Sequence, residues 1–124
     1  VDTYESKIIG AKVAYWKFKS SADEKSFESA FEEFKKMVNK SRIKSLVVAV
    51  EMDDPWGKKI QDLWIKTGEI AKKAGIVKWG VYVPENNFKK PTIRFLMNGG
   101  SAGGRNYEKF ISSSEEKVIS WALE

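Results

Sequence analysis

The residues best suited to chemistry form a short acidic stretch in the middle of the chain, where Glu51, Asp53 and Asp54 precede Trp56. Carboxylates are hard oxygen donors, and two of them together with water could hold a cation such as Mg²⁺. Two carboxylates in different environments could also divide the roles of general acid and general base. A third interpretation is that Asp54 caps the helix that follows, with Pro55 in its first turn.

Two residue types that dominate enzyme chemistry are missing. The chain of 124 residues contains no Cys and no His. Thiolate nucleophiles, disulfides, Cys-ligated zinc and the most common general base are therefore excluded. Nothing in the sequence supplies an oxyanion hole beside the carboxylates. We favour a protein that binds rather than catalyses, without a cofactor or a resident metal ion.

Basic residues outnumber acidic ones, 22 against 17, which gives a formal net charge of +5. Nearly all of them are Lys, whereas Arg is the preferred residue for bidentate contacts to phosphates and bases. One arrangement could still serve single-stranded nucleic acid, because aromatic platforms with Lys rims can stack bases. If helices cover one side of the sheet only, such a patch would lie on the other side and contain Tyr15, Lys17, Lys78 and Tyr82. Nucleic acid is the least favoured partner.

Strands and helices alternate along the chain. Residues 43–50 form a largely apolar, β-branched stretch with no alternation after Ser45, which is typical of a central strand covered on both faces. Apolar residues recur at helical spacing behind capping boxes that open at Ser21 and Ser113, and again between Gly57 and a C-terminal cap at Gly75. The expected strands are 4–9, 12–19, 43–50, 76–83 and 107–111, and the expected helices are 21–38, 57–74, 91–97 and 113–123.

These elements predict a single α/β domain over residues 1–124. Its sheet should be mixed and mostly parallel, with five strands, right-handed β-α crossovers and about four helices. The first two strands flank Gly10-Ala11, a tight-hairpin signal, so the first strand should be an antiparallel edge. The longest apolar run, 46–50, is too short to cross a membrane, and no secretory leader is evident. We expect a soluble, cytoplasmic protein.

The chain resembles a known family in three features. These are the element order, the loop Met52-Asp53-Asp54-Pro55-Trp56 with the helix around Trp64, and the ending from Tyr107 to Trp121. Together they resemble the SpoIIAA-like group of the STAS-like superfamily, which is related in fold to CRAL-TRIO lipid carriers, over nearly the whole chain. Antagonists of anti-sigma factors in this group carry a phosphorylatable Ser after the central strand, where this chain has Asp54-Pro55-Trp56-Gly57-Lys58. The resemblance therefore implies a non-catalytic regulatory or protein-interaction domain without that switch.

The kinship with lipid carriers implies a second function, the binding or transport of a small apolar ligand. The helix at 57–74 could line a pocket for an acyl chain together with a later aromatic segment, in which case the lining would be Trp56, Leu63, Trp64, Phe88, Phe95 and Leu96. The alternative is that helix-spaced aromatics form ordinary core. The segment 99–104 is rich in Gly but lacks the Gly-Lys-Ser/Thr of a phosphate loop, so we interpret it as a connector.

The leading hypothesis is thus a regulatory interaction domain that forms a homodimer, with a protein or a small apolar molecule as its partner. An apolar-ligand carrier is the first alternative, and single-stranded nucleic-acid binding is the second. The candidate ligand-binding residues are Glu51, Asp53, Asp54, Trp56, Trp64, Phe88 and Phe95.

Overall fold

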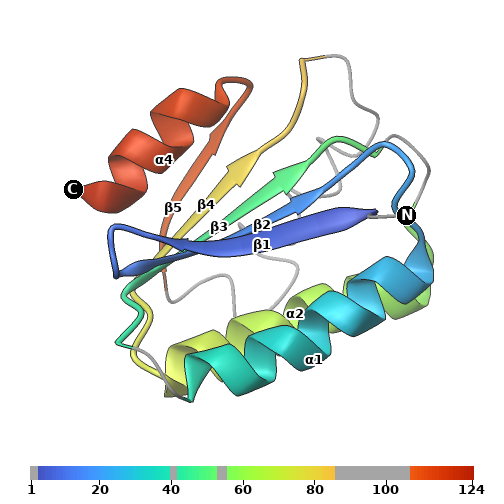
Figure 1. Ribbon diagram of the computed structural model, residues 1–124, viewed down its shortest axis with the longest axis horizontal. Helices are drawn as coiled ribbons and strands as arrows, with labels where there is room; N and C mark the ends of the chain where they lie inside the picture. Colours follow the sequence, from blue (N-terminus) through green and yellow to red (C-terminus); the bar gives the residue numbers. More distant parts are fainter. Residues whose placement is uncertain (1–2, 40–41, 53–55, 86–106) are drawn as a thin grey trace.

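One sheet organises the part of the chain that the computed structural model describes, residues 3–39, 42–52, 56–85 and 107–124. Five strands lie in the order β1-β2-β3-β4-β5, with helices on both faces (Figure 1). The strands are β1 (Tyr4–Ile9), β2 (Val13–Phe18), β3 (Ser45–Val50), β4 (Lys78–Tyr82) and β5 (Glu108–Ser112), and the helices are α1 (Glu24–Val38), α2 (Lys58–Lys73) and α4 (Glu115–Leu123).

The pairing of the strands confirms a mixed, mostly parallel α/β sheet. β1 is antiparallel to β2, and each later strand is parallel to the one before it. Both α1 and α2 lie on the same face while the chain moves one strand along the sheet each time, so the two crossovers have the same hand. The described ranges contain three helices against the four predicted, and the helix predicted over 91–97 lies outside those ranges.

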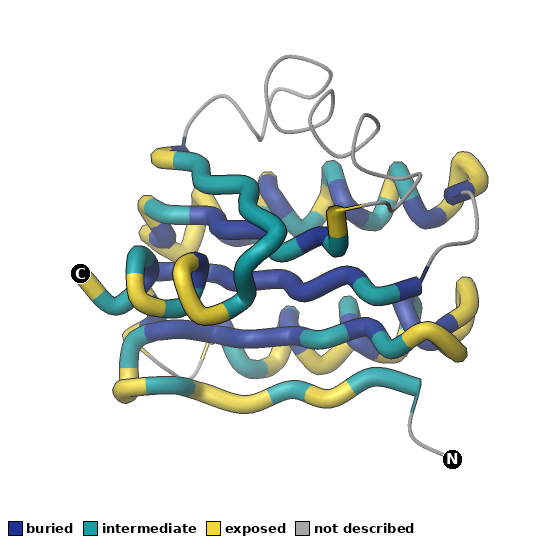
Figure 2. Tube along the Cα trace, turned by 90° about the horizontal axis from the view of Figure 1, so that it is seen from above, coloured by how far each residue is buried: buried dark blue, intermediate teal, exposed yellow. Residues whose placement is uncertain are grey.

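β3 is the buried centre of the sheet, as its unbroken apolar run predicted. All six of its residues are buried. Leu46, Val48 and Val50 pack on the side of α1 and α2, which we call the α1/α2 face. Val47 and Ala49 pack on the opposite side against α4, which we call the α4 face. Figure 2 shows the contrast with β1 at the sheet edge, where half-buried and exposed residues alternate.

The hairpin between β1 and β2 turns through two residues in the left-handed region. Gly10 and Ala11 both have φ of 60°, and the Lys12 N–H donates to the Ile9 carbonyl across the turn. Gly adopts this conformation without a steric penalty, whereas Ala11 pays one. A Cβ on Gly10 would lie 2.8 Å from Leu123 Cδ2, so the hairpin tip rests directly on the end of α4.

The helix starts differ from the sequence expectation. The N-cap of α1 is Asp23, which accepts from the Ser26 N–H at 3.0 Å, while Ser26 Oγ accepts from the Asp23 N–H at 3.1 Å. The expected box at Ser21 is wrong because Ala22 still closes a turn to Lys19, by an N–H to carbonyl bond of 2.9 Å. The cap of α4 is likewise one residue later than expected, at Ser114.

α4 approaches the sheet closely over a residue without a side chain. A Cβ on Gly80 of β4 would lie 2.6 Å from Val118 Cγ1 and 3.2 Å from Trp121 Cζ3. The close approach buries Val118 and Ala122 completely. It also lets Ser45 Oγ, buried in β3, donate to the Ala122 carbonyl at 3.1 Å. No helix in the described ranges is both long and apolar enough to cross a membrane.

We predict that Gly80→Ala lowers the free energy of unfolding by about 1–3 kcal/mol, because a rigid backbone methyl would push α4 outward. Urea denaturation measures this loss. Gly57→Ala is the matched control, since a Cβ there meets nothing within 4 Å. Adding Val118→Ala to Gly80→Ala should recover part of the loss, and equal effects of the two single Gly substitutions would contradict the prediction.

Candidate functional site

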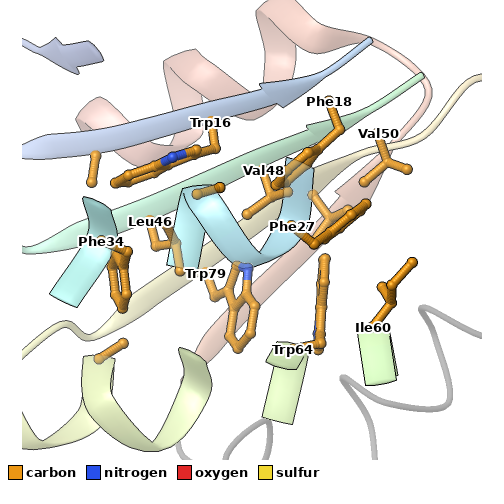
Figure 3. Close-up of a cluster of buried hydrophobic side chains, with 14 of the residues drawn as sticks. Trp16, Phe18, Phe27, Phe34, Leu46, Val48, Val50, Ile60, Trp64 and Trp79 are labelled. Carbon is orange, nitrogen blue, oxygen red and sulfur yellow. The ribbon is translucent and has the colours of Figure 1, made fainter. Parts of the chain in front are cut away.

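Aromatic rings form a continuous series through the core between the sheet and the two helices α1 and α2. Trp56 lies 5.5 Å from Phe27 and 5.1 Å from Trp64, measured between ring centroids. Trp64 in turn stacks on Trp79 at 5.0 Å, and Trp79 meets Tyr107 edge-on at 5.7 Å. Figure 3 shows Trp79 reaching from the sheet toward α2 and Trp64 reaching from α2 toward the sheet. Nearby aromatic rings add attraction beyond their burial, so this series is the main packing contact of the α1/α2 face.

A small cavity of about 40 Å³ lies within this packing. Its lining side chains are apolar apart from the Thr67 hydroxyl and the indole N–H groups of its Trp residues, and that hydroxyl already donates to the Leu63 carbonyl at 2.8 Å. Phe31, Leu63 and Thr67 are half-buried members of the lining, which places the mouth of the cavity at the seam between α1 and α2. The full lining is Trp16, Phe18, Phe27, Ala30, Phe31, Phe34, Leu46, Val48, Leu63, Trp64, Thr67 and Trp79.

Within the part of the chain that the structure describes, four indole N–H donors in this core have no hydrogen-bond acceptor. They are the Nε1 groups of Trp16, Trp56, Trp64 and Trp79, and three of these residues line the cavity. Buried polar groups in proteins are nearly always paired, and an unpaired one costs about 1–3 kcal/mol. The site therefore combines an apolar lining with several donors that lack acceptors.

The structure brings only some of the candidate residues together. Trp56 and Trp64 are neighbours in the core, and both are buried. Glu51 lies at the end of β3 on the α4 face, so it belongs to a different site from the two Trp residues. The remaining predicted site residues lie outside the described ranges: Asp53, Asp54, Phe88, Phe95 and Leu96.

Glu51 belongs to a small polar cluster at the carboxyl ends of β2 and β3. Lys17 Nζ lies 3.5 Å from Glu51 Oε2 and 3.6 Å from Glu115 Oε2. Tyr15 donates its phenolic proton to Glu115 Oε2 at 2.5 Å. Burial, and then the hydrogen bond and charge of Glu115, raise the pKa of Tyr15 far above its ordinary value. The cluster ties the first turn of α4 to the sheet.

The charge of Lys17 is stabilised by the same cluster. Partial burial alone would lower the pKa of Lys17, but the carboxylates of Glu115 and Glu51 outweigh it and raise that pKa. Within the described ranges, no group of three or more acidic side chains is placed to hold a metal ion. The cluster is therefore a structural tie, and the cation site expected of Glu51, Asp53 and Asp54 includes residues outside the described ranges.

The basic-aromatic surface expected on the second face is covered instead. The expectation required that face to be open, but α4 packs across it and Tyr15 is only 3% exposed. Lys78 is also engaged by α4, because its Nζ donates to the Trp121 carbonyl at 3.1 Å and lies 5.1 Å from the Trp121 ring centroid. The platform proposed for stacking bases is thus not available as an open surface.

The start of α2 corrects a further expectation. Its N-cap is Gly57, without a side-chain capping bond, whereas the expected cap Asp54 and the neighbouring Pro55 lie outside the described residues. Gln61 Nε2 donates to the Trp56 carbonyl at 3.0 Å instead. At the other end of α2, Gly75 has φ of +88° just after the last turn, as expected of a C-terminal cap.

Most of the cavity lining was missed as site residues from the sequence, including the two indoles Trp16 and Trp79. Both lie within expected strands, but neither strand by itself shows which of its faces meets α1 and α2. The signal lies in the pairing, because Trp16 lies beside Val48 and Trp79 beside Leu46 in neighbouring strands. Side chains of paired residues share a face, so the parity of β3 would have placed both indoles over the same helices.

Comparison with models of known protein families finds no match to this chain. Comparison with curated proteins also finds none that matches it. The site must therefore be interpreted from its own geometry.

We predict that Glu115→Ala lowers the free energy of unfolding by about 1–2 kcal/mol, because it removes the acceptor of the Tyr15 hydroxyl and one partner of Lys17. The pKa of Tyr15, measured by ultraviolet titration, should fall toward its ordinary value. Glu116→Ala is the control, since Glu116 is exposed and occupies the same first turn of α4. The tie is refuted if both variants lose equal stability.

A second prediction concerns alkaline pH. Burial raises the pKa of Tyr107 from 10.0 to about 12, and its hydroxyl donates to the Gly68 carbonyl. A raised pKa in the folded state means that this stabilisation is complete below pH 10 and disappears as the pH rises through 12. Urea midpoints measured across that range should fall less steeply in Tyr107→Phe than in the native chain. Identical slopes would contradict the assignment.

Proposed function

We propose that the protein is a non-catalytic binding domain, and that it takes a small apolar molecule with a hydrogen-bond acceptor into the cavity between α1, α2 and the sheet. The observation that supports this most directly is the set of unpaired indole donors around that cavity. An acceptor on the ligand would pair with one or more of these donors. Its apolar body would contact the aromatic lining, as is usual for small-molecule sites.

The size of the cavity limits how the ligand enters. A volume of about 40 Å³ has room for only a few water molecules, whereas a small-molecule pocket has roughly 300–1,000 Å³. A larger ligand therefore requires α1 and α2 to separate at their seam. On the outside this seam carries an exposed ion pair, in which Lys59 of α2 contacts Glu28 and Glu24 of α1. Exposed ion pairs contribute little stability, so they oppose opening only weakly.

A regulatory protein-interaction role, the first hypothesis from the sequence, stays a second proposal. Within the described ranges, the strands and helices follow the order expected from the sequence, and the helix expected over 91–97 lies outside those ranges. The segment that replaces the phosphorylatable Ser includes residues 53–55, which lie outside the described ranges. The feature that favours an interaction role is the exposed edge strand β1, since open strand edges can pair with other chains.

The indole N–H resonances allow a direct test of the ligand proposal. We predict that cyclohexanone, which carries a carbonyl acceptor, shifts the Nε1–H resonances of Trp16, Trp64 and Trp79 in ¹H–¹⁵N spectra. Methylenecyclohexane has the same shape without the acceptor and should shift them less. Trp121 lies on the α4 face and serves as the internal control. Equal shifts from both compounds, or no shift from either, would refute the proposal.

Filling the cavity should weaken the binding of cyclohexanone and therefore reduce the shifts of the indole N–H resonances. Ala30 lines the cavity from α1, so Ala30→Val adds two methyl groups there and should weaken cyclohexanone binding by about tenfold. Ala122→Val makes the same change in a buried helix position on the α4 face and should bind as the native chain does. Urea denaturation establishes that both variants are folded. Undiminished binding by folded Ala30→Val would place the ligand elsewhere.

A further inference from the structure

β1 presents a strand edge with which no described residue pairs. It lies at the end of the strand order, next to β2 alone. The Lys19 N–H donates to the Thr3 carbonyl at 3.0 Å, so the backbone of residue 3 points toward β2. Because antiparallel strands point successive residues to alternate sides, Tyr4, Ser6 and Ile8 direct their backbone N–H and carbonyl groups outward. Three successive outward positions are thus open to another strand.

The side chains of β1 carry opposite charges placed symmetrically about Ser6. Glu5 pairs with Lys17 and Lys7 with Tyr15 in the register with β2, so both point to the α4 face. Both are exposed. Tyr4 and Ile8 lie two residues from Ser6 on the other face, and Ile8 is 41% exposed although it is apolar. The strand therefore has the pattern that an antiparallel copy of itself would complement.

We propose that β1 pairs antiparallel with β1 of a second copy of this chain, about a two-fold axis through Ser6. In this register Glu5 lies opposite Lys7 of the second copy, and Lys7 lies opposite its Glu5. These are pairs without mutual backbone hydrogen bonds, in which side chains approach most closely. Tyr4 lies opposite Ile8 of the second copy, an aromatic and β-branched pair of the kind that stabilises sheets. The two sheets then form one continuous sheet, as an isologous dimer requires.

Charge selects this register over its neighbours. A shift of the axis by one residue places either Glu5 opposite Glu5 or Lys7 opposite Lys7 of the second copy, and like charges directly opposite destabilise a sheet. If the two-fold axis instead passed between two residues of β1, side chains on different sides of the sheet would lie opposite each other, which the pleat does not allow. Lys on an edge strand usually discourages pairing with other chains. Here Lys7 lies opposite an acidic residue, Glu5 of the second copy, so its charge favours the proposed register over the neighbouring ones.

Sedimentation velocity of the full chain, measured up to millimolar concentrations, tests the proposal. The native chain should dimerise, and Lys7→Glu should weaken the dimer by about tenfold or more, because both symmetric pairs become repulsive. The double variant Glu5→Lys/Lys7→Glu restores both pairs at an unchanged net charge and should dimerise as the native chain does. Equal mixtures of the single variants Glu5→Lys and Lys7→Glu should form heterodimers.

A backbone variant separates pairing from surface charge. Ser6→Pro removes an outward N–H while leaving the bonds of β1 to β2 intact, so it should abolish the dimer in a chain whose circular dichroism stays native. A native chain that stays monomeric, or a dimer that resists both Lys7→Glu and Ser6→Pro, would overturn the proposal. None of these variants touches the cavity, so the outcome is independent of the proposed ligand.

Discussion

The whole architecture depends on a strand that has no polar face. β3 is buried on both sides along its full length, so the sheet needs a helical layer above it and another below. The two crossover helices supply one layer, and α4 supplies the other. The two faces then differ: a long series of aromatic rings fills the α1/α2 face, whereas on the other face α4 packs closely over Gly80 and is held by a polar tie. The cavity and the polar cluster around Lys17 therefore lie on opposite faces of the sheet, with β3 between them.

On the α1/α2 face, large aromatic rings gain contact area while their indole N–H groups lack hydrogen bonds. An indole contributes one of the largest apolar surfaces of any side chain, but its N–H must go wherever the ring goes. Four such donors are buried without acceptors, while the rings around them are in mutual contact. The cost of these unpaired donors falls on the α1/α2 face beside the cavity, where the acceptor of a bound ligand would offset it. Under the ligand proposal, a molecule bound in the cavity would stabilise the folded state by mass action.

Periodicity predicted the fold more fully than it predicted the site. The bounds of β1 and the double burial of β3 followed from residue type and spacing, because these are local signals. The caps were misplaced since Ser21, Asp23 and Ser26 all have suitable side chains, and only the turn at Ala22 decides among them. The position of α4 was not predictable from its sequence. Its apolar stripe indicates that one side of the helix is buried, but it does not indicate which face of the sheet buries it. The cavity depends on strand parity and on pairs far apart in sequence, such as Trp64 with Trp79.

The order in which the chain leaves the ribosome gives α4 a special place in folding. Tyr15 and its partner Glu115 are separated by 100 residues. Until residues 115–123 have been synthesised, the apolar side chains of β2 and β3 on that face have no helix from the described chain to cover them. Nascent chains with an uncovered sheet face are prone to aggregate and are bound by chaperones. Docking of α4 is thus the step that ends this exposure.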